Sequence, residues 1–308
     1  MTGYNVPSEL PFALGIVRNL LRRLNYHMTK TVEQSLPEPF DAARLKAAEE
    51  ALQQMPMPSD GARAYLEKHI PRLARTLALV PPPGQTGRVL ELGCYMQITP
   101  WLDRLCGYRE VRGGYYGKAG RSDRKAMQFP DREFVCVIDL FDAERDTFPY
   151  PDAHFDLVIA GEIIEHMSYD PMHLLLESRR VLREGGYLLV TTPNIASITS
   201  VAKTLGGRDN PQIFPNYKMP LPGTEAEMGH VREYTLYELG EAVKSAGFEI
   251  EQLFTSYLEE YAGHRPLLKL LAANGFDTEN RGEQSWCLAK KREALPVNRY
   301  PIFIYSPG

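Results

Sequence analysis

The strongest constraint on this chain is the stretch FDLVIAGEIIEH, from Phe155 to His166, where an apolar run stops at two carboxylates and an imidazole. The run Leu157–Ala160 predicts a buried strand, because a strand covered on both faces is continuously apolar. Glu162, Glu165 and His166 follow where that strand ends. Ligands of open α/β sheets bind outside the carboxyl ends of the strands. The stretch therefore predicts an α/β fold with a functional site at these side chains.

Strands alternate with helical stretches over most of the remaining chain, which predicts a doubly wound parallel sheet. Two late strands are expected to form an antiparallel pair at one sheet edge. The helix before the fifth strand is expected to end near Gly185, and Thr235 with Glu238 forms a capping box for a later helix that Gly247 ends. The predicted strands are Arg88–Leu92, Val111–Tyr116, Phe134–Ile138, Phe155–Ala160, Tyr187–Thr192, Phe248–Thr255 and Gln284–Lys290, and the helices are Thr99–Cys106, Pro171–Leu182 and 235–245.

The first part of the chain is predicted to be helical. Helices are expected over 41–54, with Asp41 as N-cap, and over 61–79, and the run PPPG at 81–84 marks a boundary. We therefore predict an N-terminal helical segment, 1–84, that caps the site or contacts another subunit of a homo-oligomer, and a main domain, 85–308.

An earlier helix, 11–30, is predicted to be amphipathic and basic. It fits two alternatives, a helix that contacts a membrane surface or an anionic ligand, and a helix that packs over the active site or a partner subunit.

Composition narrows the class of protein. The chain has 308 residues and 44% hydrophobic residues, enough for a full core. It contains no apolar run of membrane-spanning length and no secretory signal pattern, so we expect a cytoplasmic protein. The four cysteines have no C-x-x-C spacing, which indicates neither zinc nor disulfides. A net charge of -4 argues against a broad grip on nucleic-acid phosphates.

The segment 195–230 contains two adjacent glycines and several prolines, and no clear periodicity. Connections of this length are commonly binding loops, so the segment predicts a substrate lid. Aromatic side chains in or near it are candidates for stacking on an acceptor ring, or for simple packing: Phe214, Tyr217 and Tyr234.

Several motifs then occur in a characteristic order between Arg88 and Lys290: VLELGC, Asp139 at a strand end, FPYPDAHFD, EIIEH, RVLREGGYLLVTTPN and REYT. In this order the chain resembles the class I S-adenosylmethionine-dependent methyltransferases, of the type 11 and type 12 groups. The resemblance implies a Rossmann-like sheet of seven strands with the cofactor S-adenosylmethionine across the ends of the first strands.

The resemblance also implies which residues bind the cofactor. Glu91 and Gly93 would flank its methionine portion, Asp139 and Leu140 would face the adenine, and the remaining contacts would come from Cys94, Tyr116 and Gly161. Two features depart from the family pattern. The usual glycines after the first strand are replaced by Cys94, Tyr95 and Gln97, and the segment 115–118, YYGK, lacks the acidic residue expected for the ribose hydroxyls.

A narrower resemblance concerns the acids. Glu162, Glu165 and His166, followed by His230 in HVREYT, are similar to the metal site of small-RNA 3′-end 2′-O-methyltransferases. Two carboxylates and two imidazoles suit Mg²⁺, Mn²⁺ or Zn²⁺, which would hold the acceptor and lower the pKa of its hydroxyl. The alternative is a site without metal, in which His166 or His230 is the general base.

The sequence thus predicts an O-methyltransferase, with a sugar hydroxyl of a glycan or glycoconjugate as the favoured acceptor by analogy. The alternatives are methylation of an RNA 3′-terminal ribose and a non-catalytic methyltransferase-like subunit. Asn194 either orients the substrate or satisfies backbone at a turn. Arg232 either meets an anionic substrate group or pairs with Glu233 or another acid.

Overall fold

The computed structural model describes residues 40–215, 229–258 and 264–306 of the chain. Its centre is a mixed sheet whose strands are, in spatial order, β3-β4-β2-β1-β5-β6-β8-β7. The predicted helix over 11–30 and Tyr217 lie outside the described residues. The strand bounds are β1 Arg88–Leu92, β2 Glu110–Tyr115, β3 Arg121–Gln128, β4 Glu133–Leu140, β5 Phe155–Gly161, β6 Leu182–Pro193, β7 Phe248–Ser256 and β8 Gln284–Lys291.

The parallel strands β4, β2, β1, β5 and β6 run in the same direction, so their carboxyl ends meet at one edge of the sheet. β8 runs antiparallel between β6 and β7, which confirms the predicted antiparallel pair. Within the described residues the sheet has eight strands in place of the expected seven, because β3 adds an antiparallel edge strand next to β4. Nearly every residue of β3 is exposed, and such a strand has no apolar alternation to reveal it.

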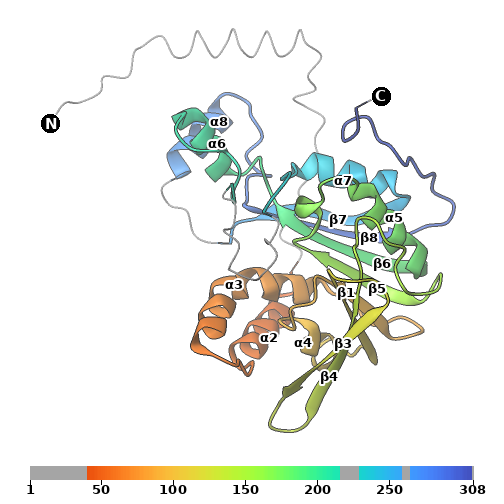
Figure 1. Cartoon of the computed structure of the whole chain (residues 1–308). Coiled ribbons are helices and arrows are strands. Elements are labelled where there is room, and N and C mark those ends of the chain that lie inside the picture. Colours follow the sequence, from red (N-terminus) through yellow and green to blue (C-terminus); the bar gives the residue numbers. More distant parts are fainter. Residues whose placement is uncertain (1–39, 216–228, 259–263, 307–308) are drawn as a thin grey trace.

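Helices cover both faces of the sheet (Figure 1). Alternate side chains of a strand point to opposite faces, and the chain uses both. On one face Val89, Leu157 and Ile159 share a core with α2, Ala42–Gln53, α3, Asp60–Leu79, and α4, Thr99–Arg104. On the other face, Leu90, Val158 and Ala160 pack with α5, Pro171–Val181, and α7, Leu236–Ser245. The described part of the N-terminal segment therefore belongs to the helical layer that covers one face of the sheet.

The local signals for helix ends are mostly confirmed. Asp41 caps α2, and Thr235 with Glu238 forms the capping box of α7. α5 is an exception, since it ends at Val181 and the chain passes directly into β6. Gly185 does have a left-handed φ of 72°, but it lies within β6 and does not cap the helix.

Two short helices were not expected. α6, Ile198–Gly206, lies inside the predicted lid, and α8, Arg265–Ala273, lies before β8. They stand together at one end of the molecule (Figure 1).

The C-terminal tail follows the outside of α5, and Arg299 and Tyr305 both bind Asp170, the N-cap of that helix.

Candidate functional site

The candidate site begins where β5 ends, because the backbone turns sharply there. Glu162 has a φ of 55°, a left-handed conformation that is costly for a residue with a Cβ, and such strain concentrates at functional sites. A single 3-10 turn, Ile164–His166, follows. The carboxylate of Glu162 accepts hydrogen bonds from Thr191 Oγ1 and Gln284 Nε2, both at 2.7 Å. Strands β6 and β8 therefore fix the first acid of the motif.

Helix α3 contributes two nitrogen-bearing side chains that the motifs did not indicate, the cation Arg72 and the neutral imidazole of His69. Arg72 Nη1 lies 3.6 Å from Glu162 Oε2, and only 14% of the Arg72 side chain is exposed. One turn earlier, half-buried His69 has its pKa lowered to about 4, first by burial and then by the charge of Arg72. The sequence predicted a helix over 61–79, but only the packing of α3 on the sheet places Arg72 beside Glu162.

Glu165 is fully buried behind Glu162. Thr192 Oγ1 donates to its Oε2 at 2.9 Å, and its Oε1 has no hydrogen-bond partner among the described residues. Burial, and next the charge of Glu162, raise the pKa of Glu165 well above its usual range. A buried carboxylate oxygen without a partner is costly, so it indicates a proton or a ligand at that position.

The backbone of Glu165 also holds the segment that carries His230. The carbonyl oxygen of Glu165 accepts from the N–H groups of Val231 and Arg232, at 2.8 and 3.1 Å. His230 is thereby placed beside the 3-10 turn although it lies far along the chain. The imidazole rings of His166 and His230 meet edge to face, with centroids 4.8 Å apart.

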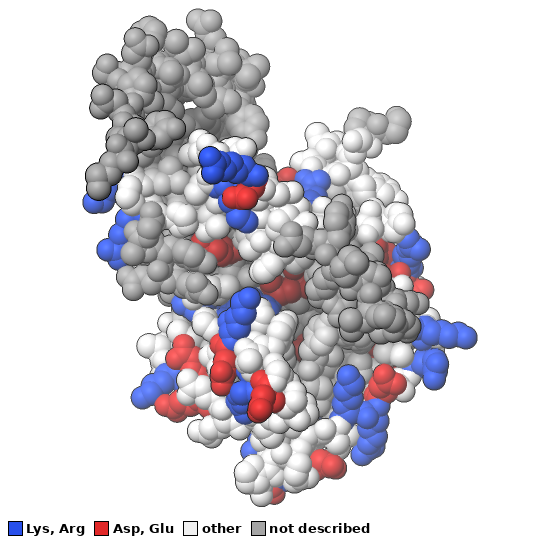
Figure 2. Space-filling model, turned by 60° about the vertical axis from the view of Figure 1, so that its left-hand side comes forward, with Lys and Arg blue, Asp and Glu red and all other residues white. Residues whose placement is uncertain are grey.

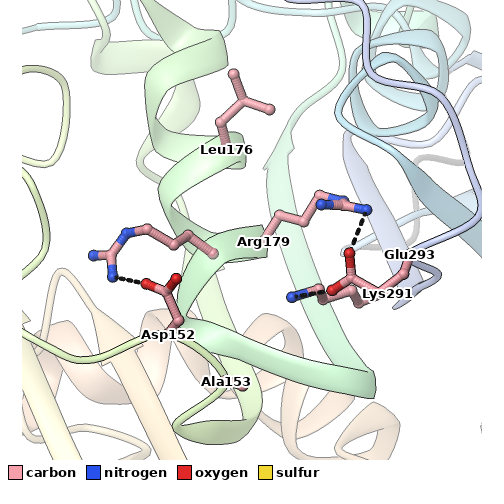
Figure 3. Close-up of a pocket in the computed structure, with 7 residues that line it drawn as sticks. Asp152, Ala153, Leu176, Arg179, Lys291 and Glu293 are labelled. Carbon is pink, nitrogen blue, oxygen red and sulfur yellow. Dashed lines mark hydrogen bonds and ion pairs between the residues drawn. The ribbon is translucent and has the colours of Figure 1, made fainter.

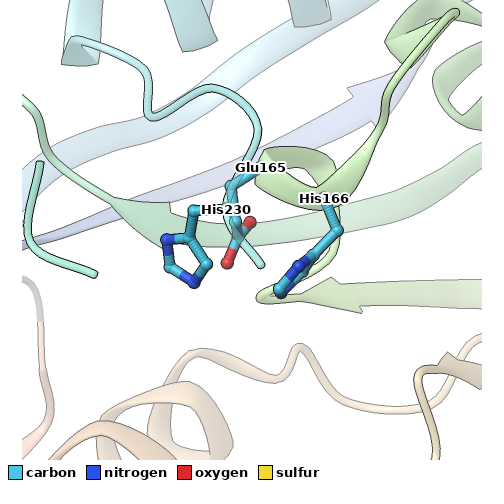
Figure 4. Close-up of side chains that lie close together, drawn as sticks. All are labelled: Glu165, His166 and His230. Atoms are coloured by element: carbon cyan, nitrogen blue, oxygen red, sulfur yellow. The ribbon is translucent and has the colours of Figure 1, made fainter. Parts of the chain in front are cut away.

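Glu165, His166 and His230 form a cluster whose potential ligand atoms all lie within 4.8 Å of one another (Figure 4). Each imidazole is held through Nδ1. His166 Nδ1 is 3.1 Å from the carbonyl oxygen of Gly229, and His230 Nδ1 is 3.1 Å from Glu233 Oε1. Metal-ligating histidines typically bond a carbonyl or carboxylate with the nitrogen that does not bind the metal. The structure thus brings together three of the four predicted ligands and engages the fourth, Glu162, with other side chains.

Three other predicted residues have structural partners. Asn194 is completely buried and donates to the carbonyl oxygens of Asn280 and Gly282, so it satisfies backbone at a turn. Arg232 forms an ion pair with Glu238 at 2.6 Å and not with Glu233. Its partner is thus another acid, as one of the two alternatives predicted. Tyr234 is 1% exposed and belongs to the core, which excludes it as a stacking surface.

Phe214 is different, because it is 49% exposed and its ring lies 5.0 Å from that of His230. Among the described residues it is therefore the predicted aromatic side chain that faces the cluster.

At the end of β1 the residues fit the methionine portion of the cofactor. Glu91 is buried, and its Oε2 has no partner among the described residues, as expected for a group that awaits an ammonium. Gly93 has a φ of 64°, and a Cβ there would approach Ile163 to 3.2 Å. The side chain of Cys94, in contrast, points into the core and contacts Thr99 Oγ1 at 3.3 Å. Only the backbone of Cys94 is left to face a ligand.

The carboxylate of Asp139, which was predicted to face the adenine, is already bound by other side chains of the protein. Asp139 accepts from Arg112 Nη2 at 2.6 Å, Ser122 Oγ at 2.7 Å and Tyr150 OH at 2.8 Å. Burial opposes ionisation of Asp139, but these hydrogen bonds outweigh it and lower its pKa. Leu140 is half-buried after it, at the end of β4.

The other predicted cofactor contacts are more open. Gly161 ends β5, and Tyr116, directly after β2, is 66% exposed. The roles of Asp139, Leu140, Tyr116 and Gly161 at the cofactor stay predictions.

A pocket of about 320 Å³ lies at the opposite edge of the sheet (Figure 3). Its cations are already paired: Arg180 with Asp152 at 2.8 Å, and Arg179 and Lys291 with Glu293 at 3.4 and 2.8 Å. This pocket is therefore distinct from the candidate site.

Comparison with known proteins decides the family. Residues 62–253, well over half of the chain, match the family described as "Methyltransferase domain". The chain belongs to this methyltransferase family. Its Rossmann-like sheet is that of the class I methyltransferases, and the family implies S-adenosylmethionine as its cofactor.

Two relatives of the methyltransferase match over shorter stretches. A probable S-adenosylmethionine-dependent methyltransferase of Mycolicibacterium smegmatis is 34% identical over 37% of this chain and 36% of its own length. The 27-O-demethylrifamycin SV methyltransferase of Amycolatopsis mediterranei is 31% identical over 44% of this chain and 51% of its own length. The matched region thus spans about a third to a half of these relatives.

Among solved structures, an S-adenosylmethionine-dependent methyltransferase from Mesorhizobium loti is similar over 73% of this chain and 98% of its own, with 16% identity and a TM-score of 0.43.

In the described part of the chain, no helix is long and apolar enough to cross a membrane.

Proposed function

We propose that the methyltransferase transfers the methyl group of S-adenosylmethionine to a hydroxyl oxygen, and that the acceptor is a sugar in a glycan or glycoconjugate. The observation that carries this proposal is the convergence of Glu165, His166 and His230 directly after the carboxyl end of β5. A hydroxyl is a weak nucleophile until its proton is removed or its pKa is lowered. The cluster offers groups suited to either task.

Metal assistance is the first form of this proposal. One carboxylate and two imidazoles suit Zn²⁺ or Mn²⁺ in particular, and Mg²⁺ less, because Mg²⁺ prefers oxygen ligands. The unpartnered Glu165 Oε1 and the Nδ1 contacts of both histidines support it. A metal would polarise the acceptor hydroxyl when bound. Without a metal, His230 or His166 would accept the hydroxyl proton.

A sugar acceptor is supported by one feature of the site, and a hydroxyl acceptor in general by one relative. The exposed ring of Phe214 beside His230 offers an apolar face of the kind on which sugar rings pack. The named reaction of the Amycolatopsis relative is also a methylation at oxygen.

An RNA acceptor has less support. On the face in Figure 2, basic and acidic side chains of the described residues are interspersed, whereas RNA binding favours a continuous basic surface.

The test is a transfer assay with labelled S-adenosylmethionine against glycan, phenolic and small-RNA acceptors. We expect label in an acid-stable ether of a glycan. Label only in the RNA 3′ end, or only on nitrogen, would contradict the proposal.

The metal requires its own measurement. Elemental analysis of the purified protein, and activity after chelation and re-addition of Mn²⁺ or Zn²⁺, distinguish the metal-assisted form of the proposal from the form without a metal. Glu165→Gln keeps an acceptor for Thr192 while removing the ionisable carboxyl group, and His230→Gln removes the imidazole. His154→Gln, at the opposite edge of the sheet, is the matched control. Full activity in both site variants would exclude the cluster from catalysis.

A further inference from the structure

Glu233 holds two parts of the candidate site at once. Its side chain is completely buried, and it accepts from His230 Nδ1 at 3.1 Å. The same carboxylate accepts from the backbone N–H groups of Ile213, at 2.9 and 3.0 Å, and Phe214, at 3.0 Å. A buried carboxylate is costly unless it is fully hydrogen-bonded, and this one gathers three donors.

The neighbours of Glu233 fix its backbone. The next residue, Tyr234, is in the core, and its carbonyl oxygen accepts from the N–H of Ile195 at 3.1 Å. Thr235 then caps α7. Glu233 therefore projects from backbone that is fixed directly before α7, and it is suited to position His230.

The contact defines the tautomer of His230. A carboxylate that accepts from backbone N–H groups also accepts from the imidazole, so Nδ1 carries the hydrogen and Nε2 has the lone pair. Nε2 is the atom through which His230 can bind a metal or accept a proton. The contacts to Ile213 and Phe214 place the Phe214 ring 5.0 Å from the same imidazole.

We propose that Glu233 is the positioning residue of the acceptor site, which sets the Nδ1–H tautomer of His230 and fixes Phe214 against it. The catalytic part of this inference rests on the proposed function, whereas the tautomer and the backbone contacts do not. The alternative is a structural role only, in which Glu233 ties down the turn at 211–214 without affecting His230.

The test compares Glu233→Gln with Glu238→Gln. Glu238 is a neighbouring carboxylate that pairs with Arg232, so its replacement breaks an ion pair without a contact to His230. The glutamine at 233 retains one acceptor oxygen and gains an NH₂ donor, so it cannot accept from all three N–H groups.

Three measurements read out the change. Imidazole ¹⁵N shifts, at one fixed alkaline pH, report the tautomer of His230. Amide exchange reports Ile213 and Phe214. We expect a shift of His230 towards the Nε2–H tautomer, faster exchange at both amides, and a fall in kcat of roughly 10- to 100-fold, the usual effect of losing a carboxylate behind a functional imidazole. KM for the acceptor should also rise, because Phe214 is no longer fixed beside His230.

An unchanged tautomer and kcat, together with faster amide exchange, would show the structural role and overturn the proposal. If Glu233→Gln does not fold, the ¹⁵N shifts of the unmodified protein still decide, because an Nε2–H tautomer there is incompatible with the proposal. If no acceptor is methylated by any form of the protein, the proposed function fails, while the tautomer of His230 still tests Glu233.

Discussion

Arg72 on α3 lies 3.6 Å from the carboxylate of Glu162 at the end of β5, and both side chains are largely buried. This contact joins the N-terminal helical layer to the candidate site. It supplies positive charge next to two acids, Glu162 and Glu165, which otherwise repel each other.

We therefore predict that Arg72→Met lowers the free energy of unfolding by about 1 to 2 kcal/mol, because a partly buried carboxylate loses its counter-ion. Glu162→Gln in the same chain should recover part of the loss. Urea denaturation of the single and double variants measures this, with exposed Lys68→Met as the control on the same helix. Additive losses in the double variant would show that the two side chains do not interact.

The ionisation of Asp139 should make the free energy of unfolding depend on pH. Its pKa is lowered in the folded protein from the ordinary value of 3.8, so its stabilising contribution is present above that pH and is lost as the pH falls through the folded pKa. We expect Asp139→Asn to cost about 2 kcal/mol at neutral pH, since three hydrogen bonds lose an ionised acceptor.

The difference between the Asp139→Asn variant and the unmodified protein should shrink below about pH 4. Thermal unfolding between pH 3 and 7 checks it. A difference that does not depend on pH would mean that the charge of Asp139 is irrelevant.

Glu91 should link cofactor binding to proton release. Burial, and next the neighbouring Cys94, raise the pKa of its carboxyl, and the ammonium of S-adenosylmethionine would favour the ionised form. Titration calorimetry in buffers of different ionisation enthalpy should therefore detect protons released on binding. Glu91→Gln should abolish the release and weaken binding by roughly tenfold or more, the loss of a charge-assisted hydrogen bond. Equal proton release in the variant would assign it to another group.

Any larger residue at Gly113 in β2 is predicted to lower the stability of the fold, because the space around this glycine is filled. A Cβ there would lie 2.8 Å from Cys94 Sγ and 2.9 Å from Ile138 Cγ1. We expect Gly113→Ala to lower the free energy of unfolding by about 1 to 3 kcal/mol through overpacking. Gly206→Ala, at the end of α6 with open space around it, should be neutral or stabilising by up to about 1 kcal/mol. Equal effects of the two changes would argue against the packing explanation.

Much of the fold was predictable because it is encoded locally. The apolar run of β5 and the caps at Asp41 and Thr235 each require only a few neighbouring residues. Two of the missed elements lack such signals: β3 is a charged edge strand, and α6 lies among glycines and prolines. The third, α8, does carry a local helix signal, because Pro266 lies at its start and leucines follow.

The sequence by itself determined the alternation of strands and helices along the chain and the presence of acids and imidazoles at a strand end. Only the tertiary structure decided which of them meet. His230 reaches Glu165 because the backbone N–H groups that follow it bind the Glu165 carbonyl, and Glu162 turns to Thr191, Gln284 and Arg72. These contacts join residues far apart in the chain. They depend on how the layers pack, and no local pattern records that geometry.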